Sequence, residues 1–165
     1  MQDFFHYTST QKLTQIFQLK PFLFPAELSY LLADLTTFGS RLPMGSPTSP
    51  VLSNFSAFGL DLELTDFARR EQITYTRFVD DMSFSKNSPA INELQLSEIN
   101  EIIISHHFVV NPSKVKWFGP DDEKMITGLT LKNNRAEIPQ KFFDQLEKDL
   151  LRVTIKSWGQ CSIPR

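Results

Sequence analysis

The sequence predicts an α+β fold in which helices cover one face of an antiparallel sheet. Segments with apolar residues at helical spacing come first, a stretch with the alternation of a β-hairpin stands between two helical segments, and strand-like pieces follow. Helices and strands that are grouped along the chain, rather than regularly alternating, are typical of this class. With 165 residues and a mass of 19.0 kDa, the chain has the length of one domain with a sizeable apolar core.

The composition argues against a repeat protein, a disulfide-bonded protein and a zinc-binding protein. The chain contains 15 Phe and 6 Gly and shows no repeat or low-complexity run, which favours a compact core. The single cysteine, Cys161, excludes an internal disulfide bond, and no cysteine–histidine cluster has zinc-binding spacing. Neither a signal peptide nor a long apolar run is visible, so we expect a cytoplasmic protein that does not contact a membrane.

The charge balance bears on a role with nucleic acids. The formal net charge is -2 at pH 7, whereas a protein that binds nucleic acid by itself is usually basic because it contacts phosphates. If this protein handles nucleic acid, we therefore expect the contacts in a local groove or through a basic surface that another segment supplies.

Two helices are predicted near the start of the chain. Thr8 or Ser9 is expected to cap the first helix, and Pro25 to open the second, which ends near Gly39. The apolar residues that define these helices are Leu13, Ile16, Phe17, Leu28, Leu31, Leu32 and Leu35.

A loop at residues 41–50 contains three prolines and a glycine and leads into a third helix. Ser49 is expected as the cap of this helix and Pro50 at its first position, and the helix is expected to end near Arg70. Its apolar face carries Leu52, Phe55, Phe58 and Leu62. The hydroxyl residues of the loop are explained equally well as simple turn and cap residues; these are Ser46, Thr48 and Ser49.

Two adjacent carboxylates mark the candidate functional site. Residues 73–78 and 82–85 are rich in β-branched and aromatic residues, which predicts a β-hairpin with Asp80 and Asp81 at its tip. In a straight strand the two side chains would point to opposite faces, but a tight turn can bring both to one ion. Carboxylate oxygens suit Mg²⁺ or Mn²⁺, and two such ions roughly 3.5–4 Å apart commonly support phosphoryl transfer. Taken alone, the dipeptide is more simply explained as a solvated bend that binds nothing.

The segment after the hairpin is predicted to form a helix and then strands. Ser88 and Pro89 open the helix, the pair Asn133 and Asn134 suits a tight turn, and Pro139 begins a last helix. The strand-like pieces are residues 108–110, 115–118 and 125–131, and the apolar residues of the two helices are Ile91, Leu94, Ile99, Ile102, Ile103, Phe142, Phe143, Leu146 and Leu150.

Four segments carry motifs at compatible spacing. Residues 42–50 read Leu-Pro-Met-Gly-Ser-Pro-Thr-Ser-Pro and are followed by Leu-Ser-Asn, and residues 75–81 read Tyr-Thr-Arg-Phe-Val-Asp-Asp. Residues 111–114 read Asn-Pro-Ser-Lys, and residues 126–129 read Ile-Thr-Gly-Leu. In this order the segments resemble motifs of bacterial reverse transcriptases of the retron and group II intron type, which include Tyr-x-Arg-Tyr-Ala-Asp-Asp, Asn-x-x-Lys and the primer-grip strand Val-Thr-Gly-Leu. The resemblance runs from Asp3 to about Leu150.

The resemblance implies the palm domain of an RNA-directed DNA polymerase. Asp80 and Asp81 would bind two Mg²⁺ or Mn²⁺ ions, which activate a primer 3′-hydroxyl against the α-phosphate of an incoming dNTP. Chemistry of this class depends on positioning and charge neutralisation. An RNA template, a DNA or RNA primer and dNTPs would be the partners of such a protein.

The same resemblance assigns roles to the other motifs. The loop would lie against the nucleotide, and the lysine of the third motif would neutralise or protonate the departing pyrophosphate. From its residue type alone, that lysine is equally explained as an ordinary solvated side chain. The implied nucleotide-binding residues are Pro43, Met44, Gly45 and Lys114, and the implied primer grip is Thr127, Gly128 and Leu129.

The start of the chain resembles the family's first catalytic motif, Asp-x-x-Asp-Phe-Phe. Asp3, Phe4 and Phe5 match its last three residues, so the first aspartate of the motif, which would bridge both metal ions, falls one position before Met1. Asp3 and Phe4 would then lie near the nucleotide, and Phe5 would be the aromatic gate that excludes a ribose 2′-hydroxyl. The alternative role of Phe5 is that of a core aromatic.

The resemblance also implies a domain organisation. Residues 1–138 would form the palm and residues 139–165 the start of a thumb, while the fingers and most of the thumb, which supply the basic template-binding surface, would lie outside this chain. Besides the mild change of Val79 for alanine, Met44 and His107 depart from the family pattern. Met44 replaces a glutamine and so removes a hydrogen-bond partner of the nucleotide, and His107 stands where a glycine is usual.

The favoured function is therefore a polymerase palm that is inactive alone, because the bridging carboxylate is missing. The alternative is a non-catalytic remnant or an assembly subunit that pairs with a separate fingers or thumb segment through apolar surface around Phe4, Phe22 and Phe24. A nucleotidyl cyclase with a similar palm is disfavoured by the motifs at residues 42–50 and 126–129. The sequence leaves open whether the parent system is a retron, a mobile group II intron or an antiviral defence module.

Overall fold

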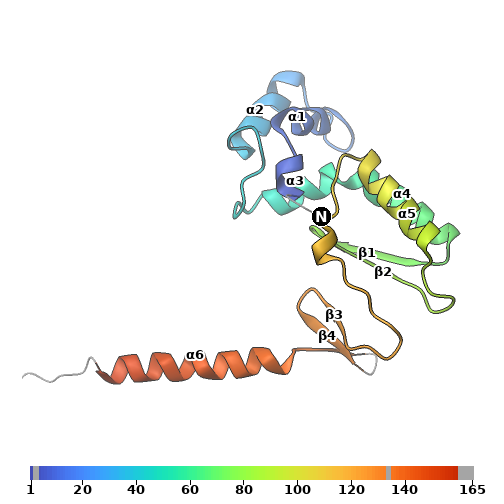
Figure 1. Cartoon of the computed structure of the whole chain (residues 1–165). Coiled ribbons are helices and arrows are strands. Elements are labelled where there is room, and N and C mark those ends of the chain that lie inside the picture. The colour runs from blue at the N-terminus through green and yellow to red at the C-terminus, as the bar shows by residue number, and fades with distance from the viewer. Residues whose placement is uncertain (2–3, 133–134, 160–165) are drawn as a thin grey trace, which may run out of the picture. The chain divides into compact units, whose positions relative to one another are not determined.

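The computed structural model describes residue 1 and residues 4–132 and 135–159, without the side chains of residues 132 and 153–159. The chain divides into two compact units, Met1–Val115 and Lys116–Arg165. The fold is α+β with small antiparallel sheets, as predicted. The strands form two separate sheets, and each unit contains one of them (Figure 1).

The first unit begins with a short 3₁₀ helix, η1 (Phe4–Tyr7), followed by α1 (Thr10–Gln18) and α2 (Ala26–Thr36). The predicted cap of α1 is confirmed, since the Ser9 hydroxyl accepts a hydrogen bond from the Lys12 amide at 3.2 Å. The second helix ends three residues before the predicted Gly39. Its last carbonyls accept hydrogen bonds from the hydroxyls of the threonines at its end, which are Thr36 and Thr37.

The predicted third helix is two helices, α3 (Ser49–Ser56) and α4 (Phe58–Arg70). The chain bends at the fully buried Ala57, whose amide bonds to carbonyls of α3 and whose ψ of 2° lies outside the helical range. The cap position of α3 is Thr48, so the prediction of Ser49 as the cap was wrong by one residue. The Ser49 hydroxyl donates instead to the Pro43 carbonyl at 2.7 Å.

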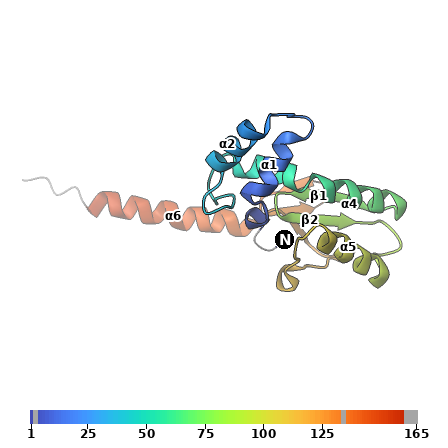
Figure 2. The same ribbon diagram turned by 90° about the horizontal axis from the view of Figure 1, so that it is seen from above.

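The predicted hairpin is confirmed. Strands β1 (Thr74–Phe78) and β2 (Asp81–Ser85) pair antiparallel with Phe78 opposite Asp81, which leaves a loop of only two residues. Helices α4 and α5 (Glu93–Ser105) lie side by side along one face of this hairpin (Figure 1, Figure 2). The arrangement agrees with the predicted covering of a sheet by helices on one face.

Helix α5 starts four residues later than Pro89. Asn92 is its cap and forms a capping box with Gln95: the Asn92 side chain accepts from the Gln95 amide at 2.9 Å, and the Gln95 side chain accepts from the Asn92 amide at 3.1 Å. Satisfying two amide groups at once fixes the start of the helix at this point.

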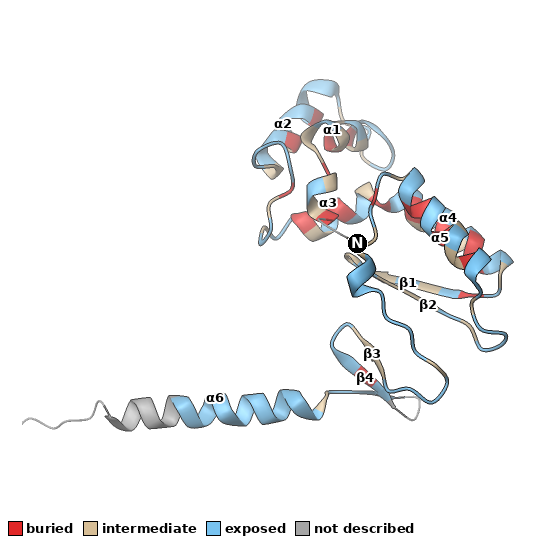
Figure 3. Cartoon of the chain, in the orientation of Figure 1, coloured by how far each residue is buried: buried red, intermediate tan, exposed pale blue. Residues whose placement is uncertain are grey.

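Two clusters of buried side chains form the core of the first unit. One lies between α4, α5 and the hairpin and is built around Leu64, Phe67 and Ile103. The other lies between α1, α2 and α3 and is built around Leu13 and Leu42. Burial is concentrated in these five helices, whereas the described positions of α6 (Gln140–Gly159) are exposed (Figure 3).

The strands predicted at residues 108–110 and 115–118 do not form. In the described part of the chain, both stretches lie outside every strand, because a 3₁₀ helix, η2 (Pro112–Lys114), interrupts this region and no described strand pairs with it. The side chain of Phe108 is nevertheless buried in the core, with 1% of its surface exposed. An apolar extended segment therefore packs here without joining a sheet.

The second unit contains three strands and α6. Residues 125–131, predicted as one strand, belong to a hairpin of β3 (Lys124–Ile126) and β4 (Leu129–Lys132), and β5 (Arg135–Glu137) pairs with the far edge of β4. Thr127 and Gly128 form the turn with φ of 48° and 87°. The Asn133-Asn134 pair lies outside the described residues. The helix predicted after Pro139 is confirmed as α6, and the division into palm and thumb at residue 138 stays a prediction.

Among the described residues, no helix combines the length and the apolar character that crossing a lipid bilayer would need.

Candidate active site

The two adjacent aspartates lie at the tip of the β1–β2 hairpin. Asp80 is half-buried in the two-residue loop, and Asp81 is exposed at the first position of β2. Within the part of the chain that the structure describes, neither carboxylate is paired with a hydrogen-bond donor or a basic side chain. Both carboxylates are therefore available to a cation.

The loop that carries Asp80 is held by Arg77. The Nη1 atom of Arg77 donates to the Val79 carbonyl oxygen at 2.7 Å and to Asn54 Oδ1 at 2.9 Å. Its Nε donates to Asp61 Oδ1 at 2.8 Å, and its Nη2 donates to Asp61 Oδ2. Only 6% of the Arg77 side chain is exposed. One guanidinium thus connects the hairpin loop to α3 and to α4.

The charge of Arg77 is neutralised locally. The hydrogen bonds that Arg77 donates to Asp61 raise the pKa of the guanidinium above its ordinary value, more than burial lowers it. Asp61 Oδ1 also accepts a hydrogen bond at 2.8 Å from the hydroxyl of Tyr75, whose pKa is raised chiefly by burial. Because Asp61 pairs with Arg77, the guanidinium does not offset the negative charge of the aspartate pair.

This network was missed by sequence reasoning. Tyr75 and Arg77 belong to the motif that contains the aspartate pair, but Asp61 precedes Arg77 by 16 residues and lies in a different element. No spacing rule for a helix or a strand relates the two positions.

The start of the chain lies beside the hairpin tip. The Met1 nitrogen donates to the Asp80 carbonyl oxygen at 2.5 Å. The Phe4 side chain is buried with 4% exposure, and its ring stacks on Phe108 at a centroid distance of 5.5 Å, with the Arg77 guanidinium 5.4 Å from the ring centre. Phe4 is therefore a core residue beneath Arg77, and its contact with a nucleotide stays a prediction.

Phe5 is half-buried and packs against both core clusters. Its role as an aromatic gate likewise stays a prediction. Asp3 lies outside the described residues.

The loop expected to face the nucleotide has a fixed base and an exposed tip. Leu42 before it is fully buried, and the buried Ser49 hydroxyl holds the Pro43 carbonyl. Met44 is 77% exposed, and Gly45 has φ of 86°, a conformation that favours glycine. Met44, which stands where the family pattern has a glutamine, thus presents its side chain to solvent.

The other predicted site residues occupy two different units. Lys114 is exposed at the end of η2 in the first unit. Thr127, Gly128 and Leu129 lie at the β3–β4 turn of the second unit. The structure therefore brings Phe4 and the loop of Asp80 together through Arg77. The segment predicted as the primer grip belongs to the other unit.

The donor set of the aspartate pair fits a hard divalent cation. Among the described residues, no group of three or more His, Cys, Asp or Glu side chains is arranged to hold a metal ion. Proteins usually bind Mg²⁺ through one or two carboxylates together with substrate phosphates and water, rather than through a cage made only of protein atoms. Asp80 and Asp81, adjacent and unpaired in the described part, are carboxylates of the kind that such a site uses.

Comparisons with known proteins agree with the motifs. Residues 3–134 match the family described as "Reverse transcriptase (RNA-dependent DNA polymerase)". The chain is 25% identical over 153 residues to the retron Ec86 reverse transcriptase of Escherichia coli, a match that covers 93% of this chain and 47% of the relative. It is 32% identical over 108 residues to the retron Mx162 reverse transcriptase of Myxococcus xanthus, which covers 59% of this chain and 22% of the relative.

The chain spans about half or less of the length of these curated relatives. The family match, in contrast, covers most of the chain and includes both the exposed loop at residues 43–45 and the hairpin with its aspartate pair. This chain is thus a member of the reverse transcriptase (RNA-dependent DNA polymerase) family.

Proposed function

We propose that this chain is the palm of a retron-type RNA-directed DNA polymerase, with Asp80 and Asp81 as ligands of two Mg²⁺ or Mn²⁺ ions. The proposal rests on two adjacent carboxylates that have no hydrogen-bond or ionic partner in the described part of the chain. They lie at a hairpin loop that Arg77 holds through a hydrogen bond to the Val79 carbonyl. When bound, such ions make a primer 3′-hydroxyl more acidic and neutralise charge on the phosphate that it attacks.

The residues of the chain have distinct tasks in this proposal. Asp80 and Asp81 hold the ions, while Arg77 positions the loop without touching substrate. The exposed loop around Met44 contacts the incoming dNTP, and Lys114 donates a proton to the departing pyrophosphate or neutralises it. An RNA template and a DNA or RNA primer are the polymeric substrates, and the turn at Thr127, Gly128 and Leu129 contacts the primer.

RNA-templated extension of a DNA primer tests the polymerase assignment in a polypeptide that carries the complete first catalytic motif of the family. The expected result is extension with Mg²⁺ or Mn²⁺ that falls by several orders of magnitude in Asp80→Asn, because a two-ion site that loses a carboxylate ligand no longer holds both ions. Undiminished extension by Asp80→Asn would contradict the proposed role of the pair.

Metal binding tests the site without requiring catalysis. Calorimetric titration with Mn²⁺ is expected to show binding to the native polypeptide and none to the double variant Asp80→Asn, Asp81→Asn. The matched control is Asp66→Asn on α4, because Asp66 is a 77% exposed carboxylate whose only described partner is the exposed Arg69. Equal Mn²⁺ binding by the native chain and the double variant would overturn the proposed site.

The second candidate is an assembly subunit that pairs with a separate segment. The apolar surface expected around Phe4, Phe22 and Phe24 is not exposed: Phe4 is buried, and the other two rings are half-buried and pack on Phe17 at 5.3 and 6.2 Å. Exposed apolar side chains lie instead on α2 and just after it, at Tyr30, Leu31, Leu35 and Phe38.

Analytical ultracentrifugation with a dye-binding assay tests this candidate. A monomer that binds no hydrophobic dye would remove the reason for proposing a partner, whereas dye binding that falls in Leu35→Ser would support it.

A further inference from the structure

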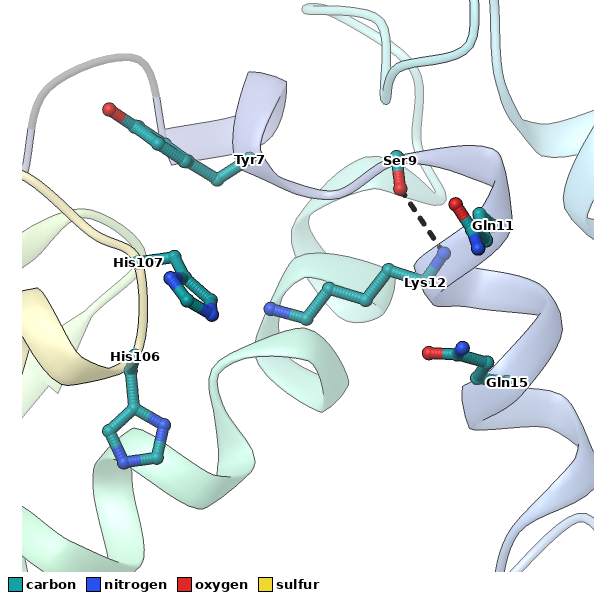
Figure 4. A pocket seen from close by; sticks show the side chains of 7 residues that line it. All are labelled: Tyr7, Ser9, Gln11, Lys12, Gln15, His106 and His107. Atoms are coloured by element: carbon teal, nitrogen blue, oxygen red, sulfur yellow. Dashed lines mark hydrogen bonds between the residues drawn. The ribbon is translucent and has the colours of Figure 1, made fainter.

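A pocket outside the aspartate hairpin lies between α1 and the turn after α5. It belongs to the first unit and is lined by Tyr7, Ser9, Gln11, Lys12, Gln15, His106 and His107 (Figure 4). Every one of these side chains can donate a hydrogen bond, and none is acidic. A pocket that is lined by hydrogen-bond donors and by no carboxylate suits an anion rather than a metal ion or an apolar ligand.

Lys12 is the centre of this pocket. Its side chain is half-buried, and the described part of the chain contains no carboxylate paired with it. Burial lowers the pKa of Lys12, because removing the ammonium from water disfavours its charged form. The ammonium lies 5.3 Å from the centre of the Phe108 ring and points toward the imidazole of His107 (Figure 4). A bound anion would provide the counter-charge that the pocket lacks.

Two histidines form the opposite side of the pocket. His106 donates through Nε2 to the carboxylate of Glu63 at 2.8 Å, so its Nδ1 atom carries a hydrogen only in the protonated ring. His107 has φ of 66°, and its ring faces Lys12 (Figure 4). Donors on α1 therefore meet the His107 ring across the pocket, an arrangement in which the oxygens of one tetrahedral group can bond to both sides.

The pocket is connected to the candidate active site through aromatic contacts. The Phe108 ring beneath Lys12 stacks on Phe4, and Phe4 lies against Arg77, which holds the hairpin loop. A ligand here would need no contact with Asp80 or Asp81, neither of which lines the pocket.

We propose that this pocket binds a phosphate group, with Lys12 and His107 as its main ligands. The phosphate can belong to a free polyphosphate such as pyrophosphate or to the backbone of a polynucleotide, since both offer the same anionic oxygens. Binding requires no divalent metal and no synthesis, so the proposal goes beyond the polymerase function.

The test is a titration of the 165-residue polypeptide in the presence of EDTA, with sodium pyrophosphate and an unphosphorylated single-stranded oligonucleotide as separate probes. In Lys12→Gln, the Kd of the bound probe is expected to rise by at least about tenfold, as a charge-assisted hydrogen bond is lost. His107→Asn is expected to weaken binding as well, and asparagine tolerates the positive φ at this position. The matched control is Lys20→Gln at an exposed lysine, expected to change the Kd by less than about twofold.

The two probes distinguish the source of the phosphate. Binding of pyrophosphate that the oligonucleotide does not displace assigns the pocket to a free polyphosphate, and Lys12-dependent binding of the oligonucleotide assigns it to a backbone. No saturable binding of either probe, or equal effects of Lys12→Gln and Lys20→Gln, would overturn the proposal. Because EDTA removes divalent ions, this failure would leave Mn²⁺ binding at the hairpin intact, whereas failure of the proposed function would appear only in the Mn²⁺ titration.

Discussion

Arg77 and Asp61 face each other through two parallel hydrogen bonds, Nε to Oδ1 at 2.8 Å and Nη2 to Oδ2, across 16 residues of sequence. The same guanidinium reaches the Val79 carbonyl in the hairpin loop. The pair therefore fixes the position of the neighbouring Asp80 relative to α4, although neither of its members is a candidate metal ligand.

Arg77→Lys is expected to lower the free energy of unfolding by about 2–4 kcal/mol. The lysine ammonium keeps the charge but cannot reach the carboxylate, the amide of Asn54 and the Val79 carbonyl together. Urea denaturation measures the change. The control is Arg69→Lys, whose exposed pair with Asp66 predicts an effect below about 0.5 kcal/mol. Similar small losses in both variants would show that the Arg77 network does not hold the hairpin.

Tyr75 makes stability depend on pH in alkaline solution. The pKa of its phenol is raised above the ordinary 10.0, mainly by burial and then by the hydrogen bond to Asp61. Above pH 10 the unfolded chain releases this proton while the folded chain retains it, so the stabilisation present below pH 10 is lost as pH rises. The loss is expected to be about 0.5–1 kcal/mol per pH unit, less than the full 1.36, because the phenol is partly exposed.

Tyr75→Phe removes this group and tests the effect. The difference in unfolding free energy between the native chain and the variant, measured by urea denaturation, is expected to shrink between about pH 9 and pH 11. Lysines titrate in the same range, but they are common to both proteins and cancel in the difference. A difference that stays constant across this range would contradict the prediction.

The aspartate pair is expected to reverse its effect on stability when metal is added. Without divalent ions, Asp80→Asn is expected to raise the Tm, because two adjacent carboxylates that pair with no basic side chain among the described residues repel each other. With Mn²⁺ at about 100 times its Kd, the native chain gains about 2.7 kcal/mol and overtakes the variant. Calorimetric scans with EDTA and with Mn²⁺ measure both signs. A lower Tm of the variant in EDTA would show that the carboxylate is already stabilised within the protein.

Ser49→Ala is expected to destabilise the chain by about 1–2 kcal/mol, because the buried hydroxyl is lost and the Pro43 carbonyl is left without this donor. The control is Ser46→Ala, whose exposed hydroxyl bonds only to Thr48 among the described residues, and whose loss is expected to cost less than about 0.5 kcal/mol. Urea denaturation of both variants provides the comparison. Equal effects would show that the base of the loop is held by packing rather than by this hydrogen bond.

Local patterns predicted the hairpin and the α1 cap because both depend on neighbouring residues. The alternation of residues 73–85 determines which strand pairs with which, and Ser9 bonds to an amide three residues away. The Asn92–Gln95 capping box carries the same kind of signal and could have placed the start of α5 correctly.

The remaining features depend on contacts that sequence spacing does not encode. Residues 108–110 have the apolar character of a strand, but only the partner segments available in the folded chain decide whether such a stretch joins a sheet. The turn at Thr127 and Gly128 splits a predicted strand because both residues adopt positive φ. The residues that line the pocket around Lys12 come from α1 and from the turn after α5. The pattern of a single segment therefore does not predict the pocket.

The shortness of the hairpin loop limits how this chain can evolve. Phe78 pairs with Asp81, so the loop holds only Val79 and Asp80. Inserting or deleting one residue would turn the rest of β2 over and remove Met82 and Phe84, which pack against the core, from the buried face. Substitutions in the loop are therefore tolerated far more readily than changes in its length. Val79, in place of the usual alanine, is an example of such a substitution.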